Sequence, residues 1–376
     1  MTNRRWFLKT ASLALASGAI TGFGPFANIS EASAKEKALP QTQVFNNRIG
    51  VHLPLWHQGS LDGDKFWNEI FKDLKAHKIQ HCFILNYYFV DPVMGRISKK
   101  SHYNNNQAPD LAFIKHGLEI AQKWKIKASL YPVLEIDNPY QIGSIWRGNL
   151  NFFGRTLETF FHQYIKLINE ISEVSRKHQS PYICIGSELA SLSHNIAARP
   201  FWEELIYQLR SPDQDRQLNL SPKLIYAAHW EEYLSFPFWR HLDDIGINAY
   251  FPLSPLSEAS PIGAPSHQQI QKTLSKKLKE LHQFSKVHGR PVHLTEFGLT
   301  PYNQTLATPW GSPQNQSIDL IEQENGYRAL LGELKKENTD WLKGVSFWHW
   351  KLPYRLGSDY NIRPYGTLAK LLKNNS

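Results

Sequence analysis

The chain has 376 residues, of which 41% are hydrophobic and 20% are charged, so it can bury a large core and is not a disordered protein. Lys and Arg give a formal net charge of +9, but they are spread along the chain among acidic residues and form no dense basic tract, which argues against nucleic-acid binding. Aromatic residues make up 13% of the chain and include 12 Trp, a surplus that suits both carbohydrate ligands and a large core.

Residues 1–34 have the features of an export signal. Asn3-Arg-Arg-Trp-Phe-Leu-Lys9 matches the twin-arginine signature, and a moderately apolar stretch follows from Thr10 to Phe26. Ala32-Ser-Ala34 then offers a small-residue cleavage site, although retention of the segment as a membrane anchor is the alternative. The segment predicts a bacterial protein that the twin-arginine machinery exports, already folded, to the periplasm or the exterior.

After a polar linker over residues 35–47, strand-forming and helix-forming runs alternate along the chain. Expected strands cover residues 48–56, 79–86, 125–133, 182–188, 223–230, 244–250, 291–298 and 344–350. Expected helices cover residues 64–77, 110–123, 156–178, 200–210, a long run that ends near 288, then 318–336 and 365–373. The helix over 156–178 has apolar residues such as Leu157, Phe161 and Ile165 at helical spacing.

Eight alternations of strand and helix predict a single α/β domain over residues 48–376, a (β/α)8 TIM barrel. The alternative is an open, doubly wound sheet. That fold would need a glycine-rich phosphate loop after an early strand, and the sequence has none there.

The two cysteines, Cys82 and Cys184, fall on the second and fourth expected strands. One strand lies between them, so they should be roughly 9–10 Å apart at ordinary strand spacing, which is too far for a disulfide. No Cys or His cluster in the sequence has the spacing of a metal site, and we expect neither a metal nor another cofactor.

In a (β/α)8 barrel the active site lies at the carboxyl ends of the strands. Most residues at these expected ends are acidic, aromatic or amide-bearing: Trp56, Asn86, Glu135, Asp137, Glu188, His229, Trp230, Asn248, Tyr250, Glu296, Trp348 and Trp350. Glu188 and Glu296 end the fourth and seventh strands, so their carboxyl groups can face each other across the barrel mouth. Glycoside hydrolysis needs such a pair, one acid for the leaving oxygen and one carboxylate that attacks or activates water. A buried salt bridge is the alternative role of each carboxylate.

The strand ends Gly186-Ser-Glu-Leu189 and Leu294-Thr-Glu-Phe-Gly298 resemble the acid/base and nucleophile motifs of retaining glycoside hydrolases of clan A. Trp146-Arg-Gly148, Asn248-Ala-Tyr-Phe-Pro252 and the Trp-rich last strand narrow the resemblance to family 113, the β-mannanase family, over nearly all of residues 48–373. The resemblance implies that Glu188 is the general acid/base and Glu296 the nucleophile. Clan A usually has Asn before the acid/base, whereas this chain has Ser187, which leaves open the group that binds the sugar 2-hydroxyl.

The expected substrate-binding residues also have structural alternatives. We expect the Tyr250 hydroxyl to bind the Glu296 carboxylate, although a core tyrosine is the alternative. Strand alternation should point Trp348 and Trp350 the same way, and we expect one of them to stack on a sugar ring rather than fill the core.

Trp146 and Arg147 lie in a loop, where a bulky pair favours a binding role over packing. His229 could contact the ligand or be a hydrogen-bonded core histidine. Asn248, with Trp56 and Asn86 at the first two strand ends, completes the expected substrate-binding set.

These features predict an exported retaining glycoside hydrolase that acts on a mannan-like, β-linked polysaccharide. The expected partners are the glycan and the export machinery, with no nucleic acid and no stable membrane span after cleavage. A second interpretation is a non-catalytic glycan-binding barrel that handles a bacterial exopolysaccharide. Such a protein would be free to lose one glutamate of the pair, and this chain keeps both.

Overall fold

The computed structural model describes residues 48–55, 62–102, 106–138, 140, 143, 145–210, 222–255, 265–311, 317–350 and 371–372. Eight parallel strands form its centre: β1 (Ile49–Leu53), β2 (His81–Val90), β4 (Lys127–Ile136), β5 (Tyr182–Ser187), β6 (Lys223–His229), β7 (Asp244–Asn248), β8 (Val292–Phe297) and β9 (Leu342–Phe347). They are hydrogen-bonded in the order β1-β9-β8-β7-β6-β5-β4-β2, and β1 also pairs with β2. The sheet therefore closes on itself, which confirms the predicted barrel and excludes the open doubly wound sheet.

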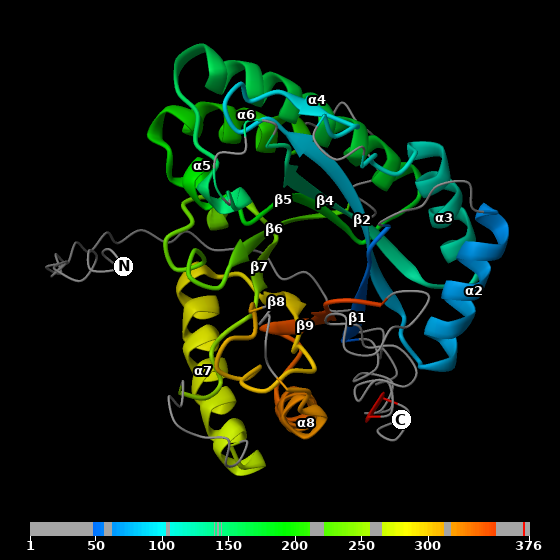
Figure 1. Ribbon diagram of the computed structural model, residues 1–376, viewed down its shortest axis with the longest axis vertical. Helices are drawn as coiled ribbons and strands as arrows, with labels where there is room; N and C mark the ends of the chain where they lie inside the picture. Colours follow the sequence, from blue (N-terminus) through cyan, green and yellow to red (C-terminus); the bar gives the residue numbers. More distant parts are fainter. Residues whose placement is uncertain are drawn as a thin grey trace, which may run out of the picture. The chain divides into compact units, whose positions relative to one another are not determined.

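The helices lie outside these strands (Figure 1): α2 (Gly63–Ala76), α3 (Leu111–Lys123), α4 (Gly154–Lys177), α5 (Ala190–His194), α6 (Arg199–Arg210), α7 (His267–His288) and α8 (Leu320–Lys336). The sequence fixes many of their ends. Ser266 and Gln269 form a capping box at the start of α7, and Gly289 ends that helix in the left-handed conformation at φ 61°.

Two connections differ from the predicted alternation. The chain between β6 and β7 has a 3-10 helix, η3 (Trp239–His241), and no α-helix, so one of the eight expected alternations lacks its helix, although none of the expected helices was assigned to this connection. Aromatic rings fill the space instead, with Phe236 stacked on Tyr226 at 4.2 Å and contacting Trp239 at 4.4 Å. A short strand, β3 (Ile97–Ser98), adds an antiparallel pairing to the end of β2 that the sequence pattern did not predict.

Several predictions concern residues outside the described part of the chain. These are the export signal over 1–34, the linker over 35–47, Trp56, and all but residues 371–372 of the expected last helix. Among the helices that the structure describes, none is both long and apolar enough to span a bilayer.

The barrel interior below the strand ends is filled by aromatic and imidazole rings. The ring centroid of His52 on β1 lies 5.3 Å from that of Phe83 and 4.7 Å from that of Tyr131. The ring centroid of His293 on β8 lies 5.9 Å from that of Phe83. Cys82 and Cys184 are buried and free on β2 and β5, with β4 between them, as the spacing predicts.

The prediction that Trp348 and Trp350 point the same way is wrong. The ring of Trp348 lies 5.3 Å from that of His52 at the barrel axis, whereas Trp350 packs against α2, 5.1 Å from the His77 ring. Trp350 is 1% exposed, and its Nε1 donates to Asp73 Oδ2 at 2.8 Å. Because β9 ends at Phe347, neither Trp belongs to the strand, so the two-residue alternation does not govern them.

We expect Trp350→Phe to lower the melting temperature and to leave the catalytic rate constant unchanged. The substitution removes a hydrogen bond to a carboxylate, which costs about 1.5–3 kcal/mol of unfolding free energy, but touches nothing at the barrel mouth. Thermal unfolding followed by circular dichroism, with an activity assay alongside, checks both parts. Normal melting together with a loss of activity would instead place Trp350 in the site.

Candidate active site

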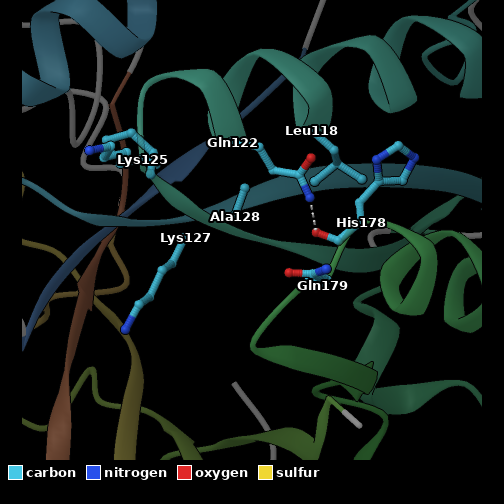
Figure 2. A pocket seen from close by; sticks show the side chains of 8 residues that line it. Leu118, Gln122, Lys125, Lys127, Ala128, His178 and Gln179 are labelled. Atoms are coloured by element: carbon cyan, nitrogen blue, oxygen red, sulfur yellow. Dashed lines mark hydrogen bonds between the residues drawn. The ribbon is translucent and has the colours of Figure 1, made fainter. Parts of the chain in front are cut away.

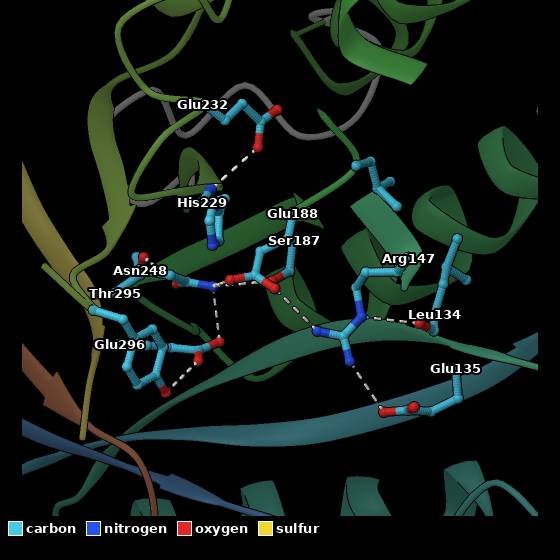
Figure 3. Close-up of polar contacts among 12 residues, drawn as sticks. Leu134, Glu135, Arg147, Ser187, Glu188, His229, Glu232, Asn248, Thr295 and Glu296 are labelled. Carbon is cyan, nitrogen blue, oxygen red and sulfur yellow. Dashed lines mark hydrogen bonds and ion pairs between the residues drawn. The ribbon is translucent and has the colours of Figure 1, made fainter. Parts of the chain in front are cut away.

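Two carboxylates meet at the carboxyl ends of the strands. Glu188 follows the last residue of β5, and Glu296 lies near the end of β8. Asn248, the last residue of β7, lies between them, and its Nδ2 is 3.0 Å from Oε1 of each glutamate (Figure 3). Since one atom reaches both carboxylates, the two Oε1 atoms are separated by no more than twice that distance. Both residues are buried, at 7% and 6% exposure.

Glu296 is held by hydroxyl donors. Tyr250 donates to its Oε2 at 2.9 Å, which confirms the predicted hydrogen bond, and Tyr131 donates to its Oε1 at 2.8 Å. Burial and the charge of Glu188 raise the pKa of Glu296 to about 7, although both tyrosines act in the opposite direction. Burial also raises the pKa of Tyr131 well above its ordinary value, so this phenol remains a donor.

Glu188 is held by Arg147, the first residue of the 3-10 helix η1 (Arg147–Asn149). Its Nη1 lies 3.3 Å from Glu188 Oε2, its Nη2 lies 3.2 Å from Glu135 Oε1, and its Nε donates to the Leu134 carbonyl at 3.0 Å. The guanidinium is therefore fixed in orientation and neutralises two acids at once.

Gly148 explains part of the Trp-Arg-Gly motif. A Cβ atom at this position would lie 2.0 Å from the ring of Trp146, so only glycine allows the indole to fold over the backbone beside Arg147.

Aromatic rings line the Glu188 side of the mouth. Trp146 is 37% exposed, and its ring centroid lies 4.9 Å from that of His229. The His229 centroid in turn lies 5.5 Å from that of Trp230. Trp230 stacks on Trp310 at 5.3 Å, and Trp310 is 47% exposed. Burial lowers the pKa of His229, although the charge of Glu188 acts to raise it. These rings form flat apolar faces next to an acid, as carbohydrate sites do.

The structure does not bring every predicted residue to the mouth. Asn86 lies in the middle of β2, which continues to Val90, and its Nδ2 lies 3.3 Å from Tyr88 Oη. Phe83 faces the barrel axis, so strand alternation places Asn86 on the opposite face, toward the helices. Asn86 is therefore not brought together with the carboxylate pair, because the strand is longer than its sequence pattern indicates.

Asp137 binds a neighbouring loop. It accepts from Ser101 Oγ and from both the backbone N–H and the Nδ1 of His102, each at 2.8 Å. The carboxylate thus joins the end of β4 to the loop after β3, which is a structural role.

Sequence patterns alone missed Tyr131, Ser187 and Thr295 as members of the hydrogen-bond network. Tyr131 Oη lies 3.0 Å from Ser187 Oγ, and Thr295 Oγ1 donates to Asn248 Oδ1 at 2.9 Å. Tyr131 lies inside an apolar strand, so the sequence pattern assigns it to the core. The only feature that could have indicated a role in the network is its inward position on β4. Ser187 stands where clan A usually has Asn, and here the amide between the two carboxylates comes from Asn248 instead.

A pocket of ≈ 320 Å³ lies at the opposite end of the barrel (Figure 2). Its lining includes Lys127, the first residue of β4, and His178, which follows α4. Since Glu135 lies near the other end of the same strand, the pocket is remote from the carboxylate pair. In barrels of this kind the amino-terminal face contributes to stability rather than to catalysis.

Comparison with solved structures gives the same fold. A GH113 β-1,4-mannanase superimposes with a TM-score of 0.70 at 15% identity, covering 88% of this chain and 98% of that one. The GH113 β-mannanase of Alicyclobacillus acidocaldarius gives 0.66 at 17% identity, covering 87% and 97%. Cel5A of Thermotoga maritima gives 0.51 at 14% identity, covering 89% and 99%. No match was found among curated proteins.

The family comparison reaches beyond the fold. The model of Glycoside Hydrolase Family 113 matches residues 57–360, a span that contains both glutamates, Arg147, Asn248 and Tyr250. The match covers most of the chain, so the protein belongs to glycoside hydrolase family 113 and is a glycosidase.

Proposed function

We propose that this glycosidase is a retaining enzyme that cleaves a mannan-like, β-linked polysaccharide by double displacement, with Glu296 as nucleophile and Glu188 as general acid/base. The observation that carries the proposal is the shared contact of Asn248 Nδ2 with Oε1 of both glutamates at 3.0 Å. Retaining enzymes have carboxyl groups about 5–5.5 Å apart, and inverting enzymes need about 6.5–9.5 Å to admit a water. A separation of at most twice 3.0 Å supports attack by a carboxylate.

In the proposed first step, Glu296 attacks the anomeric carbon while Glu188 gives its proton to the glycosidic oxygen, and the bond to the leaving sugar breaks. In the second step, Glu188 takes a proton from a water molecule. The water oxygen attacks the anomeric carbon, the bond to Glu296 breaks, and the sugar is released with its original configuration. Tyr131, Tyr250 and Asn248 fix the carboxylate that attacks, and Arg147 fixes the acid.

Burial and the charge of Glu188 raise the pKa of Glu296, whereas the proposed reaction needs Glu296 as the ionised nucleophile. The two carboxyls already contact the same amide group. Binding of the glycan therefore has to favour the form of the pair in which Glu296 is ionised.

The substrate class rests on the family and on the aromatic mouth. The two family members compared above are β-mannanases by their descriptions. Trp146, next to Arg147, and the exposed Trp310, which stacks on Trp230, offer ring faces, and Trp348 offers one near the barrel axis. Sugar rings stack on such faces, while the fixed carboxylates and amide bind hydroxyl groups.

We expect kcat/KM to fall about tenfold per pH unit above about pH 7. The reaction needs one proton on the glutamate pair, and the raised pKa of Glu296, about 7, marks the loss of the last one. Above this pH the pair has lost that proton, and no acid remains for the leaving oxygen. A pH profile of kcat/KM measures this directly, and a rate that stays level well above pH 7 would contradict it.

Release of reducing ends from a panel of β-mannan, glucomannan, cellulose, xylan and chitosan tests the proposed function. Release from β-mannan or glucomannan supports the substrate class, and release from another member corrects it. Binding of one glycan without release would favour a glycan-binding barrel and contradict the enzyme mechanism.

Export is also part of the proposal. It rests on the twin-arginine motif and the small-residue cleavage site within residues 1–34. Fractionation of cells that produce the full chain tests it, since an exported protein is found in the periplasm or the medium. Replacing Arg4 and Arg5 with Lys should then retain the protein in the cytoplasm.

A further inference from the structure

We propose that Glu232, a buried carboxylate outside the catalytic pair, is a positioning residue that holds Glu188 in the orientation needed for proton transfer. Glu188 has a backbone φ of 54°. This left-handed conformation is uncommon for residues other than glycine and costs of order 1–3 kcal/mol, so the surrounding structure has to maintain it.

Two hydrogen bonds maintain that conformation, one on each side of the Glu188 α-carbon. The Glu188 N–H donates to the Ala227 carbonyl at 2.9 Å, and the next N–H, that of Leu189, donates to Tyr226 Oη at 2.7 Å. The second bond is a side-chain contact, so it depends on what orients the Tyr226 hydroxyl.

Glu232 orients that hydroxyl. Tyr226 donates its only hydroxyl proton to Glu232 Oε1 at 2.8 Å, which leaves an oxygen lone pair for the Leu189 N–H. The Leu189 N–H can only donate, so the Tyr226 oxygen accepts from it and the Tyr226 proton is left for Glu232. Glu232 therefore acts on Glu188 through one tyrosine and one peptide group.

The remaining contacts of Glu232 fix it firmly. Its Oε1 also accepts from Ser193 Oγ at 2.8 Å, and its Oε2 accepts from the His229 N–H at 3.1 Å. Glu232 is 4% exposed. Its donors are Tyr226 within β6, Ser193 of α5, and His229, which ends β6 and contacts Trp146. Figure 3 shows Glu232 above His229, with the Glu188 carboxylate lower in the view. One carboxylate thus holds together the two strand ends that carry Glu188 and His229.

This inference rests on the proposed role of Glu188 as the acid, and substrates of different leaving-group ability test it. A misplaced acid should slow the cleavage of a polysaccharide, whose leaving group needs a proton, far more than that of a 2,4-dinitrophenyl glycoside, whose leaving group needs none. The value of kcat/KM reports only the first displacement, so the comparison isolates proton donation.

For Glu232→Gln and Tyr226→Phe we expect kcat/KM on the polysaccharide to fall about 10- to 100-fold, and on the dinitrophenyl glycoside of the matching disaccharide to change less than about threefold. Glu204→Gln is the matched control, because Glu204 is an exposed acid of α6 that accepts from Gln208 of the same helix. It should change neither value. Equal losses on both substrates, or no loss on either, would overturn the proposal.

A crystal structure of Tyr226→Phe provides a readout that does not need activity. We expect Glu188 to leave the left-handed conformation and its carboxylate to move away from Asn248. An unchanged Glu188 would overturn the inference even if the wild-type protein cleaved neither substrate, an outcome that would separately refute the proposed function.

Discussion

Replacing Glu296 with Gln should lower kcat on the polysaccharide by roughly 10⁴-fold or more, because an amide cannot form the covalent glycosyl intermediate. The substitution is nearly isosteric. One of Tyr250 and Tyr131 can still donate to the amide oxygen, and the hydroxyl of the other can accept from the amide N–H, so the fold and substrate binding should persist. Kinetics of the purified variant, with melting temperature as the check on folding, measure the effect.

A covalent trap identifies the attacking residue independently. A 2-deoxy-2-fluoro glycoside with a good leaving group should form a stable adduct with the wild-type enzyme, and peptide mass spectrometry should place it on Glu296. Glu333→Gln is the control for replacing a buried glutamate, because Glu333 lies on α8, is 3% exposed and is paired with Lys336. An adduct elsewhere, or a product of inverted configuration, would contradict the assignment of Glu296.

Replacing Glu188 with Gln should lower the rate on the polysaccharide by about 10²- to 10⁴-fold, the usual contribution of a general acid. The first displacement on a dinitrophenyl glycoside should be much less affected, because its leaving group departs without a proton. The glycosyl intermediate should then accumulate, since the base for the second step is also lost.

Azide supplies the decisive measurement for Glu188. It is a nucleophile that needs no general base, so it should restore turnover of the dinitrophenyl substrate by the variant and give a β-glycosyl azide. No rescue by azide, or an azide product of α configuration, would exclude Glu188 as the acid/base of a retaining enzyme.

The barrel could be predicted from the sequence because its signals are local. Apolar spacing in segments such as 156–178 identifies a helix before any tertiary contact exists, and α4 covers Gly154–Lys177. Strand order follows once strands and helices alternate, since parallel neighbours need a crossover on one side of the sheet. The same logic separates Cys82 from Cys184 and brings Glu188 and Glu296 to the same end of the barrel.

The tertiary structure alone decided which side chains meet. Asn86 and Trp350 turn away from the mouth because strand ends set side-chain direction, and neither end is marked in the sequence. Tyr131 and Glu296 are 165 residues apart, and they meet because β4 and β8 face each other across the closed barrel. Glu232 lies in a connection that the sequence pattern leaves unassigned, and only its partners show that it supports Glu188. The sequence by itself thus determined the barrel and its two acids, because periodicity and strand ends are local properties. Their separation, orientation and hydrogen-bond partners depended on barrel closure, which no local pattern encodes.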